Sequence, residues 1–169
     1  MTMFHDVGDF HDKFGLPVTL GSRKCAFPDD ATLAYRLRFL QEELNEYEQA
    51  VREGDLAGAV DALADLAWVA LGTAHFFGAP FDAVWREVYR ANMSKVLAVE
   101  GAPVHKRGVV EKIRKPVGWL PPDIQLMIDN HNRLANDANQ RPRMLSKMSD
   151  AEFSELMKPT MPQIEGEIE

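Results

Sequence analysis

Apolar residues recur at helical spacing along most of the chain, and glycine and proline divide the pattern into segments. The clearest case has intervals of three and four between Leu33, Leu37, Leu40, Leu44, Tyr47 and Val51. Such intervals put all of these side chains on one face of a helix. Asp29 or Asp30 can cap its start, and Gly54 is a typical stop. The pattern therefore predicts a long helix between these residues, with its leucine-rich face in the core.

The next segment, Leu56 to Phe77, is apolar on almost every face. Asp61 and Asp65 are the only charged residues from Leu56 to Ala74. A helix that is apolar all round is normally buried, and a buried carboxylate without a partner costs several kcal/mol or more. Because no Lys, Arg or His lies within this run, we expect a bound cation to compensate the two aspartates.

The remaining segments complete an all-α prediction. We expect helices at Met3–Phe14, Phe81–Val96, from Pro122–Asp123 onward, and at Asp150–Met157, with loops at 16–28 and 100–121. The two long helices are joined at Gly54 and Asp55, a link so short that they should pack antiparallel. We divide the chain into an all-α domain, 1–136, and a polar C-terminal extension, 137–169, that could lie as an arm on a neighbouring subunit.

This antiparallel pair is expected to form a four-helix-bundle core that oligomerisation completes. Two helices cannot bury every face of a segment as apolar as Leu56–Phe77. We expect the helix at Phe81–Val96 to cover part of it and a second subunit to cover the rest.

Composition narrows the class of protein. The chain has 169 residues and a net charge of −7, which argues against a nucleic-acid backbone as its main partner. The single cysteine, Cys25, excludes an internal disulfide and a multi-cysteine zinc site. The charged N-terminus does not resemble a signal peptide, and the longest apolar run, Leu66–Phe77, is too short to span a bilayer. We expect a cytoplasmic protein without a membrane partner.

Five carboxylates form the candidate chemical centre. Glu42, Glu43 and Glu46 occupy one and a half turns of the first long helix, and the antiparallel pairing brings them toward Asp61 and Asp65. The glutamates alone would be read as a solvated helix face. Together with aspartates in an apolar run, they favour a site for a hard ion, Mg²⁺ or Mn²⁺, over a zinc site.

Three further features have alternative interpretations. Asn92 and Lys95 are three residues apart at a helix end, where they could hold phosphate or simply be an exposed, favourably charged terminus. The basic group at 106–115 is better explained as a solvated loop. His75, in an aromatic run, is better explained as a hydrogen-bonded core residue than as a ligand.

Several motifs together resemble a known family. EELNE at 42–46, DALADLAWVALGTAHFFG at 61–78 and FDAVWREVYRANMSK at 81–95 are similar to the MazG-like all-α nucleoside triphosphate pyrophosphohydrolases. FHDKFGLP at 10–17 and KPVGWLPPDI at 115–124 resemble its short, single-domain members, which are often encoded by viruses or phages. The resemblance extends from about Phe10 to Ile128.

The resemblance implies hydrolysis of a (deoxy)nucleoside triphosphate to the monophosphate and pyrophosphate, with Mg²⁺ or Mn²⁺, by a homodimer or homotetramer. It implies that Glu43, Glu46 and Asp65 are metal ligands. The family usually has a glutamate where this chain has Ala62, so Asp61 is the available substitute ligand.

The resemblance also suggests roles around the metal. Glu42 and Glu46 are the catalytic candidates, with Glu42 orienting or deprotonating the attacking water, while Asn92 and Lys95 hold phosphate. Aromatic candidates for the base pocket are Phe10, Phe14 and Trp68, and dGTP or dUTP are the substrates we expect first. The competing hypothesis, kept open by Ala62, is a catalytically silent bundle that binds nucleotide or a protein and uses the acids for a structural ion.

Overall fold

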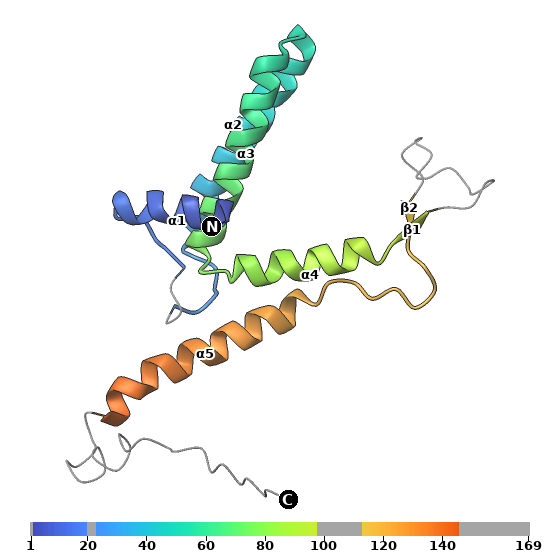
Figure 1. Ribbon diagram of the computed structural model, residues 1–169. Coiled ribbons are helices and arrows are strands. Elements are labelled where there is room, and N and C mark those ends of the chain that lie inside the picture. Colours follow the sequence, from blue (N-terminus) through green and yellow to red (C-terminus); the bar gives the residue numbers. More distant parts are fainter. Residues whose placement is uncertain (1, 20–22, 98–112, 146–169) are drawn as a thin grey trace, which may run out of the picture.

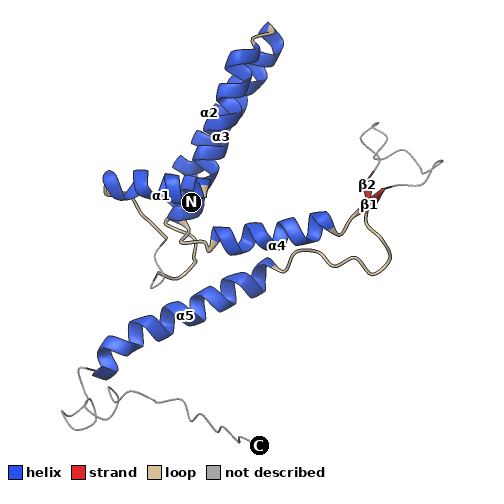
Figure 2. Cartoon of the chain, in the orientation of Figure 1, coloured by secondary structure: helices blue, strands red, loops and turns tan. Residues whose placement is uncertain are grey.

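The computed structural model describes residues 2–19, 23–97 and 113–145, apart from the side chains of residues 140–145. The described part is mostly helical, which confirms the all-α prediction (Figure 1, Figure 2). Its elements are α1 (Met3–Lys13), α2 (Asp30–Glu53), α3 (Leu56–Phe76), α4 (Phe81–Met93), β1 (Val96–Leu97), β2 (Ile113–Arg114) and α5 (Ile124–Leu145).

The helices α2 and α3 form the predicted antiparallel hairpin, and local chemistry fixes its ends. The Asp29 side chain accepts a hydrogen bond from the backbone N–H of Thr32 at 2.8 Å and caps α2. Gly54 ends α2 with a φ of +73°, a left-handed conformation that glycine adopts without steric cost. Asp55 follows at once and caps α3 through the backbone N–H of Gly58. The chain therefore reverses within two residues.

The face of α2 that packs most deeply differs from the predicted one. Its buried residues recur every seven positions and are Arg36, Glu43 and Ala50. These buried residues mark the seam along which α2 packs on α3. The predicted leucine face lies beside this seam and is partly exposed: Leu37 is 69% and Leu44 46% accessible. Only α2 runs along the upper part of α3, where the buried residues are the small Ala59 and Ala62 (Figure 1). Such small side chains allow close approach of the two backbones, so short or polar residues can occupy the seam.

The core of the chain lies at the base of the hairpin, where α1 crosses α3 (Figure 1). Phe4 and Val7 of α1 pack against Leu71 and Ala74 of α3, and Phe81 at the start of α4 closes this cluster. His75 is 3% exposed and hydrogen-bonded here, which confirms its prediction as a core residue.

The fourth helix was expected to cover part of α3, and it does so only at Phe81, beside the C-terminal half of α3, among the described residues. After Phe81, α4 leads away from the hairpin and packs against α5 instead (Figure 1). Gly78 makes the turn with a φ of +64°, and a side chain there would lie 2.8 Å from the carbonyl of Lys24. Among the described residues, the upper part of the hairpin is thus left uncovered, and α3 exposes Leu56, Val60 and Leu63 there.

The chain after α4 also differs from the prediction. The helix ends at Met93, and Val96 begins a short antiparallel strand pair in which it opposes Arg114. The helix α5 continues to Leu145, so the proposed domain boundary at 136 falls inside a helix. The predicted helix at 150–157 and the basic residues at 106–112 lie outside the described residues.

Hydrogen bonds tie α5 to the base of the hairpin through the segment before α2. Asn132 accepts a bond from the Cys25 N–H at 2.7 Å, and His131 bonds the Arg23 carbonyl at 2.7 Å. The Arg23 guanidinium in turn donates to the carbonyls of His75 and Phe76 at the end of α3. Within the described part of the chain, these bonds anchor the α4–α5 pair to the base of the hairpin.

Among the described helices, α3 is long and apolar enough to cross a membrane, with a mean hydropathy of 1.4 over its most apolar 18 residues. The expectation that its apolar run is too short rested on Leu66–Phe77, whereas the helix begins at Leu56. Core helices of soluble proteins pass the same test of length and composition.

Candidate active site

A buried carboxylate lies at the middle of the hairpin seam. Glu43 is 7% exposed and occupies the position between Arg36 and Ala50 that packs onto α3. No described residue donates a hydrogen bond to it. Burial of an ionised carboxylate without a donor or a cation is unfavourable, but at Glu43 the cost is limited because the carboxylate oxygens still reach solvent.

The other four predicted acids act on Glu43. Burial raises the pKa of the Glu43 carboxyl, and the negative charges of Glu46, Asp65, Glu42 and Asp61 raise it further, in that order. The hairpin therefore brings the other four acids within electrostatic range of Glu43.

The acids other than Glu43 are more exposed than the sequence predicted. Asp61 and Asp65 are both exposed, so their predicted burial within the chain is wrong. The cause is the course of α4, which leaves this part of α3 uncovered. Across the described residues, no three His, Cys, Asp or Glu side chains are gathered closely enough to hold a metal ion.

The donor set nevertheless suits a hard divalent ion. Every titratable group acting on Glu43 is a carboxylate. Oxygen ligands without sulfur or imidazole favour Mg²⁺ or Mn²⁺. A cation among these acids would also offset the charges that raise the pKa of Glu43. Glu43, Glu46 and Asp65, with Asp61, are the residues that would hold it.

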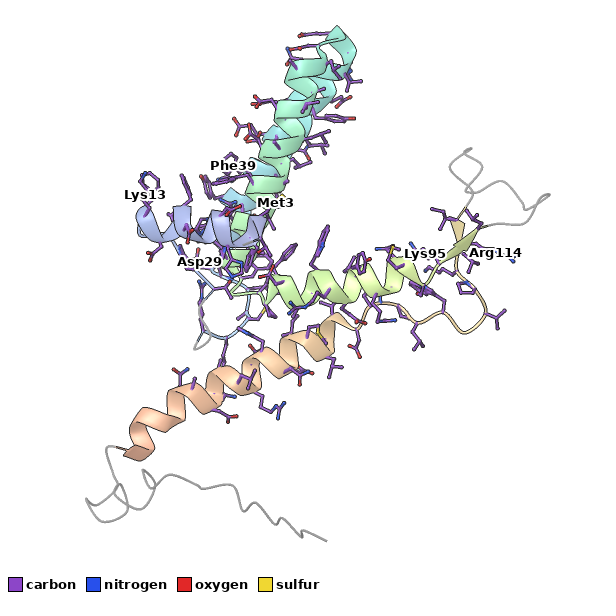
Figure 3. The ribbon with its side chains drawn as sticks, viewed as in Figure 1. Met3, Lys13, Asp29, Phe39, Lys95 and Arg114 are labelled. Carbon is purple, nitrogen blue, oxygen red and sulfur yellow. The ribbon has the colours of Figure 1, made fainter. Side chains whose placement is uncertain are left out.

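The predicted phosphate-binding pair lies elsewhere. Lys95 donates from Nζ to Oδ1 of Asn92 at 2.7 Å, so the two residues do form a unit. Figure 3 shows Lys95 at the far end of α4, beside Arg114 and away from the hairpin that carries Phe39. A helix of this length extends about 20 Å, so one chain does not bring this pair to its own acids.

The three predicted base-pocket residues do come together. The Phe10 ring lies 4.7 Å from the Phe14 ring and 5.5 Å, edge to face, from the Trp68 ring. All three are partly open to solvent, with exposures of 39%, 59% and 41%. Trp68 follows Asp65 by three residues on α3, so this aromatic cluster begins one helical turn below the acids.

Sequence reasoning missed Arg36, the second charge in the seam. It is 7% exposed and donates from Nη2 to the Val69 carbonyl at 2.7 Å and from Nε to the Thr73 hydroxyl at 3.1 Å. Its guanidinium also lies over the rings of Phe39 and Phe76. The available signal was the seven-residue interval between Arg36 and Glu43, which places both charges on one face of α2.

Comparisons with known proteins found a family model and a viral relative that are similar to this chain. Residues 7–92 match the family model of phosphoribosyl-ATP pyrophosphohydrolase, which spans α1 to the end of α4 and includes every acid of the site. An uncharacterized protein of Acanthamoeba polyphaga mimivirus is 33% identical over 82 residues, which are 48% of this chain and 33% of that protein. The chain thus spans about a third of the length of this relative. The chain belongs to the phosphoribosyl-ATP pyrophosphohydrolase family, within the superfamily of MazG-like all-α nucleoside triphosphate pyrophosphohydrolases.

Proposed function

We propose that the protein hydrolyses a (deoxy)nucleoside triphosphate to the monophosphate and pyrophosphate. Its family acts on phosphoanhydride bonds of nucleotides. The observation that carries the proposal is the buried Glu43 with four other carboxylates acting on it. An arrangement of this kind is unfavourable by itself and becomes favourable when cations and their phosphate ligands are added.

The proposal includes Mg²⁺ or Mn²⁺ held by Glu43, Glu46, Asp65 and Asp61. When bound, such ions supply positive charge to the phosphate oxygens and make the attacking water more acidic. Two ions would match the four carboxylates, with Asp61 in place of the glutamate that the family resemblance leads us to expect at Ala62.

Side chains of the protein would orient and deprotonate the attacking water. Water adds to phosphorus at one end of the anhydride bridge, and the bridging oxygen leaves with its electron pair. Glu42 is exposed beside Glu43, where its carboxylate can accept the proton of that water. Glu46, the neighbour that raises the pKa of Glu43 most, would share the catalytic role.

We further propose that Asn92 and Lys95 contribute to the acidic site of a second copy of the chain. They hold phosphate and stabilise the charge that develops on it. The hairpin exposes apolar residues on both helices that a second hairpin can cover, completing a four-helix bundle in a homodimer or homotetramer. These residues are Leu37, Leu44, Val51, Leu56, Val60 and Leu63.

The aromatic cluster of Phe10, Phe14 and Trp68 is the proposed base pocket. Its rings are partly exposed and lie one turn from Asp65, a short distance from where the phosphates would sit. The virus-type resemblance leads us to propose dGTP or dUTP as substrate and control of the nucleotide pool, in the cytoplasm or the host cytoplasm, as the role.

The test is a pyrophosphate-release assay on the full chain. The substrates are the four dNTPs, dUTP, the four NTPs and phosphoribosyl-ATP, each with Mg²⁺, with Mn²⁺ and with chelator. We expect metal-dependent release from a subset of substrates and none from Glu46→Gln. Glu48→Gln is the control, because Glu48 is exposed on the same helix and pairs with Arg52. Turnover by Glu46→Gln at the normal rate would refute the assignment.

A second candidate is favoured by Ala62, which is 3% exposed on α3. A glutamate there would project toward the seam, and this chain lacks it. A catalytically silent bundle would bind a nucleoside triphosphate with divalent ion, measured by calorimetry, while releasing no pyrophosphate from any substrate of the panel.

A further inference from the structure

The junction between α1 and α3 contains two histidines whose protonation states are fixed by their partners. His75 is 3% exposed, and its Nε2 lies 2.9 Å from the Phe4 carbonyl. A carbonyl only accepts, so Nε2 carries the proton. The N–H of Thr19 donates to Nδ1 at 3.1 Å, so Nδ1 must offer a lone pair. Both partners are satisfied by the neutral ring alone.

His11, on α1, has one such partner. It is 3% exposed, and its Nδ1 donates to the Pro17 carbonyl at 2.6 Å. Its Nε2 points at the backbone of Gly72, where a Cβ would lie 3.0 Å from it and 3.1 Å from Nη2 of Arg36. A second proton on His11 would therefore create a cation close to a buried guanidinium.

The charges that face these rings do not compensate a proton. His11 and His5 from α1 and Arg23 from the following segment oppose protonation of His75. From α2, Arg36 opposes protonation of His11. On α4, Asp82 lies 3.5 Å from Nδ1 of His5 and is engaged there. On α5, His131 binds the Arg23 carbonyl. Burial, the largest cause, and these neighbours lower the pKa of both rings.

We propose that α1 and the segment 17–19 form a proton-controlled clamp on the hairpin, closed when His75 and His11 are neutral and released when they are protonated. Opening separates the Thr19 N–H from His75 and removes the Phe4 ring that stacks on it at 3.9 Å. It also carries Phe10 and Phe14 away from Trp68.

The sign of the effect follows from proton linkage. The released state takes up protons at the ordinary histidine pKa of about 6.5, and the closed state takes them up only at lower pH. The clamp is therefore closed above this pH and weakens as the pH falls below it. Release of α1 does not depend on the proposed function, whereas the accompanying loss of nucleotide affinity rests on it.

Amide hydrogen exchange of the full chain, measured from pH 8 to pH 5 and corrected for intrinsic rates, tests the clamp without nucleotide. Below pH 6.5 we expect exchange of peptides from residues 2–19 to accelerate by up to about tenfold per pH unit for each histidine involved. Peptides from the upper hairpin, 40–66, should keep their protection. Protection of 2–19 that does not change with pH would overturn the proposal.

Matched variants identify the titrating groups. Gln at position 75 can donate to the Phe4 carbonyl and accept from the Thr19 N–H but has no proton to gain. The Asn amide at position 11 can donate to the Pro17 carbonyl. The double variant His11→Asn, His75→Gln should lose the pH dependence of exchange in 2–19, and an unchanged dependence would refute the role of these rings.

If the double variant does not fold, NMR titration of the histidine rings in the unmodified chain decides the question. We expect His75 and His11 to stay neutral until the α1 resonances shift. Titration at the ordinary pH with α1 unchanged would overturn the clamp. Failure of the pyrophosphate-release assay would leave both measurements unaffected.

Discussion

Arg36 and Glu43 occupy equivalent positions on α2, one heptad apart, and each is 7% exposed against α3. Arg36 donates to a carbonyl and a hydroxyl and lies over aromatic rings. Glu43 receives no hydrogen bond from the described residues and is acted on by four like charges. One of these charges is thus satisfied by protein groups, whereas the carboxylate of the other is left to solvent.

The difference indicates different roles for two neighbouring levels of the seam between α2 and α3, which we call the Arg36 layer and the Glu43 layer. The Arg36 layer, covered by α1, stabilises the fold with partners that the chain supplies. The Glu43 layer has no cover from α1 or α4 and concentrates negative charge. A buried group that its own chain leaves unsatisfied is a candidate for binding something else.

The largest expected effect is on activity. Glu43→Gln should reduce pyrophosphate release about a thousandfold, equivalent to about 4 kcal/mol in the activation free energy, because it removes the central charge of the proposed metal site. Circular dichroism should show an intact fold. Glu48→Gln serves as the control. If the activity of Glu43→Gln stayed within a few-fold of normal, Glu43 would have no active-site role and the contrast with Arg36 would fail.

The second effect is on stability at the Arg36 layer. Arg36→Met should lower the free energy of unfolding by about 2–4 kcal/mol, because the Val69 carbonyl and Thr73 lose a charged donor and the rings lose a packed guanidinium. Urea denaturation measures the loss. Arg38→Met, at an exposed position on the same helix, should change stability by less than about 0.5 kcal/mol. Equal effects of the two variants would contradict the structural role.

The third effect is the response to divalent ions. Mg²⁺ or Mn²⁺ at a hundred times its dissociation constant should stabilise the unmodified chain by about 2.7 kcal/mol, seen as a rise in Tm that chelator reverses. The rise should shrink in Glu43→Gln and persist in Arg36→Met. A rise of the same size in Glu43→Gln would show that the ion binds elsewhere.

The smallest effect is the pH dependence of stability without divalent ions. The folded-state pKa of Glu43 is raised, so the folded chain holds its proton at a pH where the unfolded chain has lost it. Stability from this group is therefore present at low pH and is lost as the pH rises above about 4.5. Subtracting the pH dependence of the unfolding free energy of Glu43→Gln from that of the unmodified chain isolates the contribution of Glu43. A contribution of the opposite sign would show that the carboxylate is favourably paired.

The features that sequence could predict are those fixed by neighbours in the chain. Gly54 and Asp55 were predictable because a left-handed stop and a side-chain cap act over three or four residues. The five acids were predictable because aspartates in an apolar run stand out, and the short turn dictates which acids face them. The aromatic candidates Phe10, Phe14 and Trp68 came from the family resemblance, because no local pattern relates α1 to α3.

The features that sequence missed depend on contacts between distant segments. Leucine spacing predicts a face of α2, but the small Ala59 and Ala62 on α3 decide which residues of that face lie deepest. Arg36 was missed for this reason. The course of α4 depends on the turn at Gly78 against the Lys24 carbonyl, and it decides the exposure of Asp61 and Asp65.

The direction of α4 has a measurable consequence for an enzyme built this way. If Lys95 serves acids on another copy, turnover requires an encounter that helix formation does not. A solution diluted until the copies separate would keep its circular dichroism spectrum and lose its rate per chain. Specific activity would then report self-association directly, at concentrations too low for scattering or sedimentation to follow.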